Sequence, residues 1–489
     1  MRALSIPTAL AATLLCACSH TPVGPDYVLP AQSLAAQPAA AAQFNQAAES
    51  AGALFTMAPL PPHWWRLYDD ARLDALVQRA LVHNTDLRQA TANLEKVQAQ
   101  ADEAGAARGV SAALSGGPSF GHASGLSYLQ KGYVPPNHFS ASASAALSYQ
   151  LDLVGQLQRS VEAADANTGA AEAGQDLARV SVVGATTRAY AQACSAGLRW
   201  QSAQRSVQLQ REALAVAGQL QRAGRVGMLD LNRAKAQLEQ LNAAMPPLQA
   251  ERQAALLRLA TLTGALPGDL PAGVADCQTP PQVTQALPVG DGAALLRRRP
   301  DVRQAERELA AATARIGVAT GELYPHITLG LSASSVGPAP DFGRSDALAW
   351  GLGPLISWTV PNTGAVQARI AQAEAGTRGA LAKFDGTVLT ALRETETALN
   401  AYARELERRA ALTAAREAAA KVAEQAGQLY RGGKTGYLDL LDADRSLASA
   451  DAALAASESQ LADDQVQLFM ALGGGWETLP ASPVASVKP

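Results

Sequence analysis

The stretch that decides the fold is Leu429-Tyr430-Arg431-Gly432-Gly433-Lys434-Thr435-Gly436-Tyr437-Leu438-Asp439-Leu440-Leu441-Asp442. It lies between two long alanine-rich segments without proline, and its glycines are the strong helix breakers there. Glycine just past a helix C-terminus permits the left-handed turn that ends the helix. Because a helical pattern resumes directly after Gly436, the stretch predicts the tip of a long helical hairpin.

A second tip of the same kind lies upstream, in residues 220–231. Similar helix openings also occur twice, as Asp86-Leu87-Arg88-Gln89-Ala90 and Asp301-Val302-Arg303-Gln304-Ala305. Repeats of this size indicate a duplicated architecture rather than a short-period solenoid. We therefore expect turns at the glycines of both tips, namely Gly224, Gly227, Gly432, Gly433 and Gly436.

The segments before the two tips predict very long helices. Residues 155–224 and 364–432 contain no proline, and at about 1.5 Å per residue each helix is about 100 Å long. A heptad series, Leu440, Leu447, Leu454, Leu461 and Leu468, predicts coiled-coil packing of the returning helix in the second copy. In the first copy Pro246-Pro247 predicts a break in the returning helix.

Four segments predict β-strands, two in each copy. The clearest are residues 139–152 and 348–360, where apolar and small polar residues alternate. Each is long enough to cross a bilayer as a tilted strand. Shorter strands are expected at 110–117 and 327–336. A half-buried strand of a soluble sandwich shows the same alternation. Since four strands cannot close a membrane barrel, a barrel would need strands from other subunits.

Composition excludes several classes of protein. The 489 residues carry a formal net charge of −3 without a basic stripe, which argues against nucleic-acid binding. We find no catalytic motif and no histidine or cysteine spacing typical of a metal site, so we expect no enzyme, metal or cofactor. Cys194 and Cys277 can pair in an oxidising compartment, but their isolation favours two separate packed thiols.

The N-terminus predicts export and lipidation. Arg2 and a short apolar run end in Leu15-Cys16-Ala17-Cys18, which resembles a bacterial lipobox with cleavage before Cys18 and a covalent lipid on it. The residue after Cys18 is Ser19, whereas an aspartate at this position favours retention in the inner membrane. Outer-membrane delivery is therefore expected. The alternative is a plain secretory signal with chance cysteines.

Taken together, these features resemble the outer-membrane factor family, the TolC-like and OprM-like exit ducts of tripartite efflux pumps, in its lipoprotein branch of the NodT type. The order and spacing of short motifs along nearly the whole mature chain carry the resemblance. These motifs are Val23-Gly24-Pro25-Asp26-Tyr27, Trp64-Trp65, Tyr149-Gln150-Leu151-Asp152-Leu153, Arg299-Pro300-Asp301-Val302, and Tyr430-Arg431-Gly432 through Leu441-Asp442-Ala443.

The resemblance implies a mainly helical chain whose homotrimer closes a twelve-stranded membrane β-barrel continuous with a hollow periplasmic α-barrel. It implies a passive, gated exit duct in the outer membrane, working with a periplasmic adaptor and an inner-membrane pump. The chain then divides into residues 1–17 (signal peptide), 18–62 (lipidated strap), 63–290 (first repeat, tip near 222–229), 291–475 (second repeat, tip near 430–438) and 476–489 (tail).

The family's periplasmic aperture is formed by the hairpin tips, and the motif match places Leu438 and Asp442 there, with Asp439 and Tyr430 close by. Asp439 and Asp442 share a helix face, so a trimer gathers about six carboxylates that attract cations, repel anions and resist full closure. The alternative is that acidic residues in the first turn only complement the helix dipole, and that Tyr430 only staples the hairpin.

The first copy has Arg233 where the second has Asp442, so a contact between Arg233 and the acidic tip is a candidate latch of the closed state. The tip glycines are expected to form turns and also to dock the adaptor. For the cargo, the lipoprotein branch favours drugs or other toxic small molecules. Metal-ion efflux, type I protein secretion and, outside this class, a periplasmic coiled-coil scaffold are the alternatives.

Overall fold

The computed structural model describes residues 22–49, 54–122, 131–270, 273–358 and 363–477, with Ser124, Leu126 and Leu129 between them. The predicted signal peptide, Cys18 and most of the predicted tail lie outside the described residues. The chain forms two compact units, each built from both halves of the sequence. We call them the sheet unit (up to Leu29, Leu94–Ala171, Ala305–Phe384) and the hairpin unit (Pro30–Asn93, Glu172–Gln304, Asp385–Pro489).

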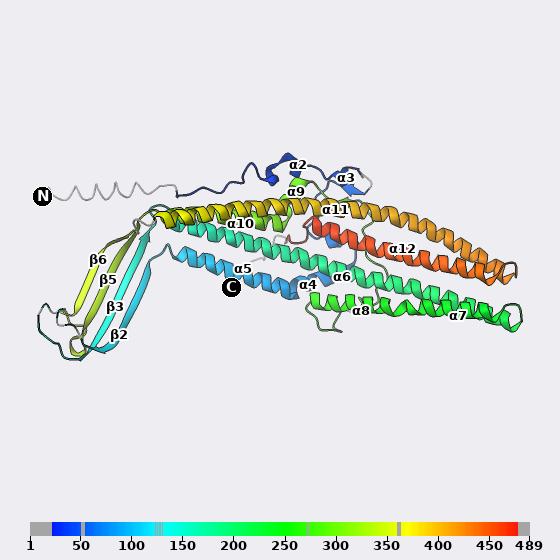
Figure 1. The fold of residues 1–489 in the computed structure, drawn as a ribbon, viewed down its shortest axis with the longest axis horizontal. Helices are drawn as coiled ribbons and strands as arrows, with labels where there is room; N and C mark the ends of the chain where they lie inside the picture. Colours follow the sequence, from blue (N-terminus) through cyan, green and yellow to red (C-terminus); the bar gives the residue numbers. More distant parts are fainter. Residues whose placement is uncertain are drawn as a thin grey trace, which may run out of the picture. The chain divides into compact units, whose positions relative to one another are not determined.

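The sheet unit contains all four predicted strands in one antiparallel sheet (Figure 1). The strands follow the order β2-β3-β5-β6, so the two copies pair through β3 and β5. Their bounds, which confirm the predicted segments within a few residues, are β2 Ser111–Gly121, β3 His138–Leu151, β5 His326–Pro338 and β6 Leu348–Ser357.

The two faces of this sheet differ in chemistry, as the alternating sequence predicts. On one face the hydroxyl groups of facing serines on β2 and β3 hydrogen-bond at 2.6–2.7 Å, in the pairs Ser111–Ser148, Ser115–Ser144 and Ser119–Ser140. On the other face Leu331 lies opposite Leu352, and Trp350 is 75% exposed. The described chain thus leaves a broad apolar sheet face without a covering layer of its own.

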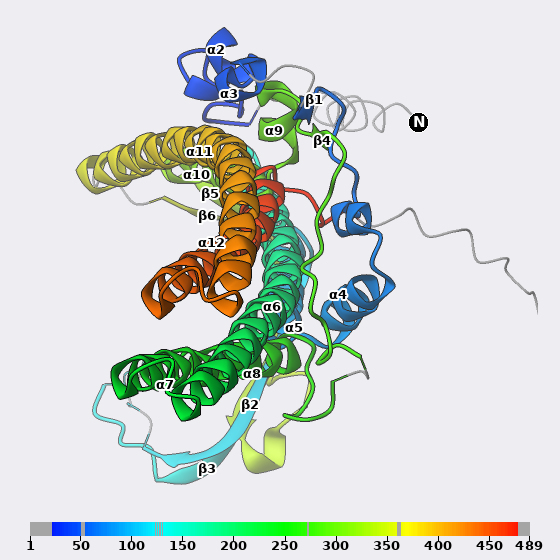
Figure 2. The ribbon, with the colours of Figure 1, turned by 90° about the vertical axis from the view of Figure 1, so that its right-hand side faces the viewer.

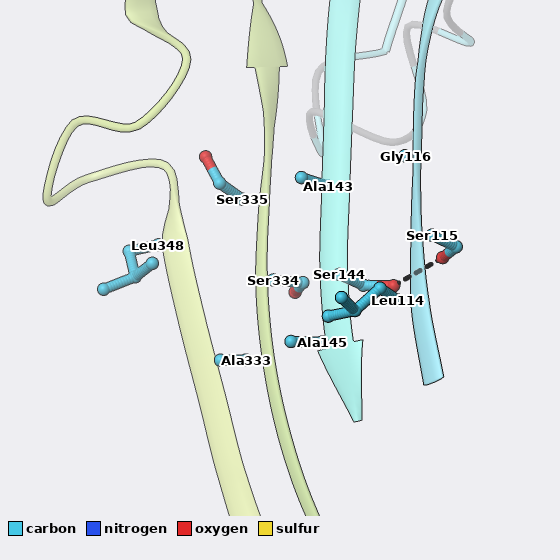
Figure 3. A pocket seen from close by; sticks show the side chains of 10 residues that line it. All are labelled: Leu114, Ser115, Gly116, Ala143, Ser144, Ala145, Ala333, Ser334, Ser335 and Leu348. Carbon is cyan, nitrogen blue, oxygen red and sulfur yellow. Dashed lines mark hydrogen bonds between the residues drawn. The ribbon is translucent and has the colours of Figure 1, made fainter. Parts of the chain in front are cut away.

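A shallow hollow of about 450 Å³ lies on this sheet (Figure 3). Leu114 and Leu348 lie among its lining residues, and the others are Ser, Ala or Gly. Its lining residues are all uncharged, and the Ser115 and Ser144 hydroxyl groups in it bond to each other. The hollow therefore offers a ligand little beyond small apolar contacts.

The helices follow the predicted duplicated pattern. Each copy opens with two shorter helices, α4 Ala71–His83 and α5 Thr85–Ala106 in the first and α9 Gly292–Arg298 and α10 Pro300–Gly321 in the second. The long helices are α6 Gln156–Arg222 and α11 Thr363–Arg431, with 67 and 69 residues. The returning helices are α7 Met228–Ala243 with α8 Met245–Leu262, and α12 Tyr437–Ala471.

The predicted break before Pro246-Pro247 is confirmed, because the returning helix of the first copy ends at Ala243 and restarts at Met245. The remaining elements are short. They are α2 Pro38–Ala41, α3 Asn45–Glu49, the 3-10 helices Leu34–Ala36, Trp64–Tyr68 and Ala339–Asp341, and the parallel pair β1 Phe55–Thr56 and β4 Leu287–Pro288. Within the described ranges, none of the helices has both the length and the apolarity to cross a bilayer.

The core of the hairpin unit gathers aromatic residues from distant parts of the chain. Trp64 is fully buried, stacks on Phe469 with ring centroids 4.7 Å apart, and donates its indole N–H to the Gly474 carbonyl at 3.2 Å. Tyr190 and Leu399 are buried in the same cluster. The α6–α7 and α11–α12 hairpins lie side by side (Figure 1 and Figure 2).

The prediction of two separate cysteine thiols is wrong, because Cys194 and Cys277 form a disulfide with their Cα atoms 4.7 Å apart. The bond joins α6 to the loop after α8 across 83 residues of sequence. Gly197, one turn along α6, allows this approach, since a Cβ atom there would overlap the Cys277 carbonyl oxygen. Only the tertiary packing of that loop brings the two sulfurs together.

Candidate functional site at the hairpin tips

The two tips are built by the same turn. In the second tip Gly433 has a φ of +66°, and Lys434 N–H donates to the Leu429 carbonyl at 2.9 Å. In the first tip Gly224 has a φ of +69°, and its neighbour Arg225 donates to the Leu220 carbonyl at 2.9 Å. These are the 6→1 bonds of a Schellman motif, which requires a left-handed residue that glycine supplies without strain.

The remaining tip glycines also lie in these turns. Gly432 follows the last residue of α11, while Gly227 and Gly436 occupy the N-cap positions of α7 and α12. Both caps have extended backbone, and as glycines they have no side chain to accept a hydrogen bond from the N–H groups of the helix N-terminus. Adaptor docking at these turns stays a prediction.

A small aromatic cluster packs the two tips together. Tyr430 and Tyr437 are 5% and 4% exposed, with ring centroids 5.8 Å apart in an edge-to-face arrangement. They pack with Ala217 and Ala234 of the other hairpin. The buried Gln210 side chain donates to the Ala234 carbonyl at 3.1 Å and to the Tyr437 hydroxyl at 3.4 Å. Within one chain Tyr430 therefore packs the two hairpins against each other. Its place at an aperture stays a prediction.

Three of the predicted aperture residues are exposed on the first turns of α12. Leu438 is 49% exposed, and the carboxylates of Asp439 and Asp442 face solvent. The Thr435 hydroxyl donates to Asp439, whereas no described residue pairs with the Asp442 carboxylate. An apolar side chain thus stands beside two accessible negative charges, which is the combination that a cation-attracting constriction requires.

Arg233 contacts its own helix rather than the acidic tip of the same chain. Its Nη1 atom lies 3.3 Å from Oδ1 of Asp230 on α7, one turn away. A latch between Arg233 and the acidic tip of another chain stays a prediction. Besides the Gln210–Tyr437 bond, a hydrogen bond between the hairpins runs from Arg445 Nε to Gln237 Oε1, at 2.8 Å.

Sequence reasoning missed three polar residues behind the tip, and helical spacing points to two of them. Arg445 lies three residues after Asp442, and Gln237 lies four residues after Arg233. Asp444 is the third. It is half-buried, no described residue hydrogen-bonds its carboxylate, and burial raises its pKa to about 6. Within the described ranges, no group of His, Cys, Asp and Glu side chains is placed to bind a metal ion.

Comparison with known proteins identifies the family. The family model "Outer membrane efflux protein" matches residues 76–265 and 293–474, one match in each copy of the duplication. Nodulation protein T of Rhizobium leguminosarum bv. trifolii is 30% identical over 430 residues, covering 87% of this chain and 88% of the relative. The toluene efflux pump outer membrane protein TtgC of Pseudomonas putida is 29% identical over 500 residues, covering 98% of both chains.

A solved structure of the outer-membrane channel OprN superposes with a TM-score of 0.85 at 36% identity, covering 93% of this chain and 99% of that one. The similarity confirms the predicted fold class, in which long helices and a strand region build an outer-membrane channel. It also confirms the outer-membrane location and the exclusion of an enzyme. With the family model covering both halves, this chain belongs to the outer membrane efflux protein family.

Proposed function

We propose that three copies of this chain form a gated exit duct for a tripartite efflux system. Each chain gives its four strands to a twelve-stranded barrel in the outer membrane, and its long helices wall a conduit across the periplasm. The sheet supports this assembly, since β2 and β6 are edge strands and its apolar face is open. Pairing β6 of one chain with β2 of the next removes every edge.

The duct is passive and works with two partners. A periplasmic adaptor docks at the hairpin tips, and an inner-membrane pump supplies the energy and selects the cargo. A covalent lipid on Cys18 adds an anchor in the outer membrane. The family membership supports this division of labour, because efflux through an outer-membrane channel needs a driving force from elsewhere in the envelope.

The proposed cargo is small toxic molecules, such as drugs or solvents. The name of TtgC, which describes a toluene efflux pump component, supports this class. Metal ions are the second candidate, because the exposed Asp439 and Asp442 carboxylates favour cations. Transport assays with a lipophilic dye and with a divalent metal, in cells that carry the cognate pump, separate the two.

The observation that carries the gating proposal is the exposure of Asp439 and Asp442 beside Leu438 at the tip. In a trimer these groups surround one axis, and the aromatic cluster with the Arg445–Gln237 bond holds the hairpins that carry them. Opening then requires the second hairpin to move away from the first. Closure leaves a narrow acidic ring that passes small cations before larger solutes.

The test is single-channel conductance of the purified protein in planar bilayers. We compare wild type with Asp439→Asn/Asp442→Asn and with Glu417→Gln, an exposed acid on α11 away from the tip. Loss of cation selectivity in the double variant alone supports the acidic aperture. Unchanged selectivity moves the gate elsewhere, and absence of any channel from folded trimer overturns the duct in favour of a scaffold.

A further inference from the structure

A buried arginine in the sheet unit holds the start of the N-terminal strap. Arg159, near the start of α6, is 3% exposed in its side chain. Its Nε atom donates to the Val23 carbonyl at 3.0 Å, and its Nη2 atom donates to the Gly24 carbonyl at 3.1 Å. The same Nη2 atom lies 2.7 Å from an Asp26 carboxylate oxygen. We call residues 22–27 the anchor segment.

The arginine is fixed from its other side by Glu162, whose carboxylate lies 2.7 Å from Nη1. One guanidinium thus bonds a carboxylate of its own helix, a carboxylate of the anchor segment and backbone carbonyls of that segment. Such a fan of donors requires the planar fork of arginine, which lysine does not offer. The contacts form a built site rather than a surface ion pair.

The backbone around the arginine is shaped to receive the anchor segment. Val23 N–H donates to the Val154 carbonyl at 2.9 Å. Gly24 has a φ of +87°, and a Cβ atom on it would lie 2.5 Å from the Gly317 Cα atom. Gly155 has a φ of +74°, and a Cβ atom there would lie 2.5 Å from the Pro22 Cβ atom. Both positions therefore require glycine for reasons of conformation and space.

The site lies where strands become helices. Val154 and Gly155 connect the end of β3 to α6, and Gly317 lies in the last turns of α10, shortly before β5. Only four residue steps separate Pro22 from Cys18, and an extended chain covers at most about 14 Å in four steps. A lipid on Cys18 therefore lies at most about 14 Å from Pro22, which contacts the junction between the strands and the helices.

We propose that Arg159 and the anchor segment form a lock that limits the distance between the lipid anchor and the base of the sheet. The inference rests on the proposed function, in which Cys18 carries a lipid and the sheet lies in the outer membrane. The acyl chains then enter the inner leaflet beside the β3–α6 junction. The lock thus holds the lipid at a fixed place beside the sheet. A strap without the lock would let the lipid move relative to the sheet.

Chymotrypsin reports directly on the lock. Tyr27 is half-buried, its hydroxyl donates to Glu306 at 3.3 Å, and Val28 is exposed. Chymotrypsin can therefore bind the Tyr27 ring and cut before Val28 only after the ring has left Glu306. Residues 22–65 contain no Lys or Arg, so trypsin does not cut this region and serves as a reference protease. Cleavage after Tyr27 releases the peptide that begins at Cys18, and its mass also shows whether the cysteine is acylated.

The experiment uses the full-length protein extracted from membranes, as wild type, Arg159→Ala, Gly24→Ala and Arg159→Lys. Arg315→Ala is the matched control, because it removes an exposed arginine of the same unit that bonds Asn167 at 3.1 Å. We expect release of the peptide to be at least about tenfold faster in Arg159→Ala, which loses the hydrogen bonds of a buried guanidinium, and in Gly24→Ala, which loses the backbone fit. Arg159→Lys should be intermediate.

Unchanged release in Gly24→Ala overturns the lock. This variant keeps the test valid even where Arg159→Ala fails to fold, because Gly24 lies on the strap, whereas Arg159 lies in the long helix α6. Release that rises equally in Arg315→Ala also overturns it. The planar-bilayer conductance of the same samples separates the lock from the duct. Normal conductance with unchanged release refutes the lock alone, whereas fast release from variants of a protein without any conductance refutes the proposed duct alone.

Discussion

Arg445 on α12 donates a hydrogen bond from Nε to the side-chain oxygen of Gln237 on α7, at 2.8 Å. Gln237 is 7% exposed, whereas Arg445 is an exposed residue, so the bond is partly buried. It joins the hairpin of the second copy to that of the first, behind the exposed acids of the tip. A charged hydrogen bond of this kind contributes about 1.5–3 kcal/mol, enough to bias an opening equilibrium.

Replacing Arg445 by alanine should therefore favour the open tip. If about 1.4 kcal/mol of the bond energy opposes opening, the open fraction rises about tenfold. Single-channel recording of Arg445→Ala should show a larger mean conductance than wild type. Arg416→Ala is the control, because Arg416 bonds Asp451 at 2.8 Å within one hairpin rather than between hairpins. An equal rise in both variants would assign the effect to general loosening.

The disulfide between Cys194 and Cys277 should stabilise the hairpin unit. It closes a loop of 83 residues, and loss of such a crosslink typically costs about 2–5 kcal/mol. The Cys194→Ser/Cys277→Ser variant should therefore unfold at a lower temperature than wild type. A reductant should lower the wild-type transition toward that of the variant and leave the variant unchanged. Coincident transitions of the oxidised wild type and the variant would contradict the prediction.

The sequence predicted what periodicity and helix breakers determine. The proline-free runs gave α6 and α11 within two residues, and the alternation in residues 139–152 gave β3 and its two faces. The disulfide and the Arg445–Gln237 bond were not predictable in this way. Each depends on how one helix is rotated against a distant segment, and a single sequence has no local signal for that rotation.

In the candidate site, too, local features were predictable from the sequence and tertiary contacts were not. The tip glycines and the exposed positions of Asp439 and Asp442 follow from turn chemistry and helical spacing, both of which are local. The burial of Tyr430 does not, because it depends on Ala217 and Ala234 of the other hairpin. Arg159 was passed over for a similar reason, since its partners lie more than 130 residues away in the strap.

The two faces of the sheet should respond differently to charge. Leu352→Arg places a cation on the apolar face, where the side chain is 66% exposed, while Ser332→Arg places it on the opposite face of the neighbouring strand. In a membrane barrel an arginine on the lipid face costs about 2–4 kcal/mol near the midplane. The fraction of heat-resistant trimer in outer-membrane preparations should fall for Leu352→Arg and change little for Ser332→Arg. Equal losses would argue against a lipid-facing Leu352.

Asp444 should make the stability of the tip depend on pH. Burial raises its pKa from 3.8 to about 6, so the folded chain favours the protonated carboxyl. This contribution is fully present below about pH 4 and is lost as the pH rises through 6. Above that pH the folded chain holds a half-buried carboxylate, with which no described residue forms an ion pair. Asp444→Asn should therefore stabilise the protein at pH 8, by about 1 kcal/mol after discounting for partial exposure.

Thermal unfolding of wild type and Asp444→Asn at pH 4, 6 and 8 tests this sign. The two proteins should unfold together at pH 4 and separate progressively as the pH rises, with the variant the more stable. Asp442→Asn, two residues away on the exposed face, controls for the change in net charge and should show no such gain. A difference between wild type and Asp444→Asn that is the same at pH 4 and pH 8 would mean that the side chain acts through packing and not through its charge.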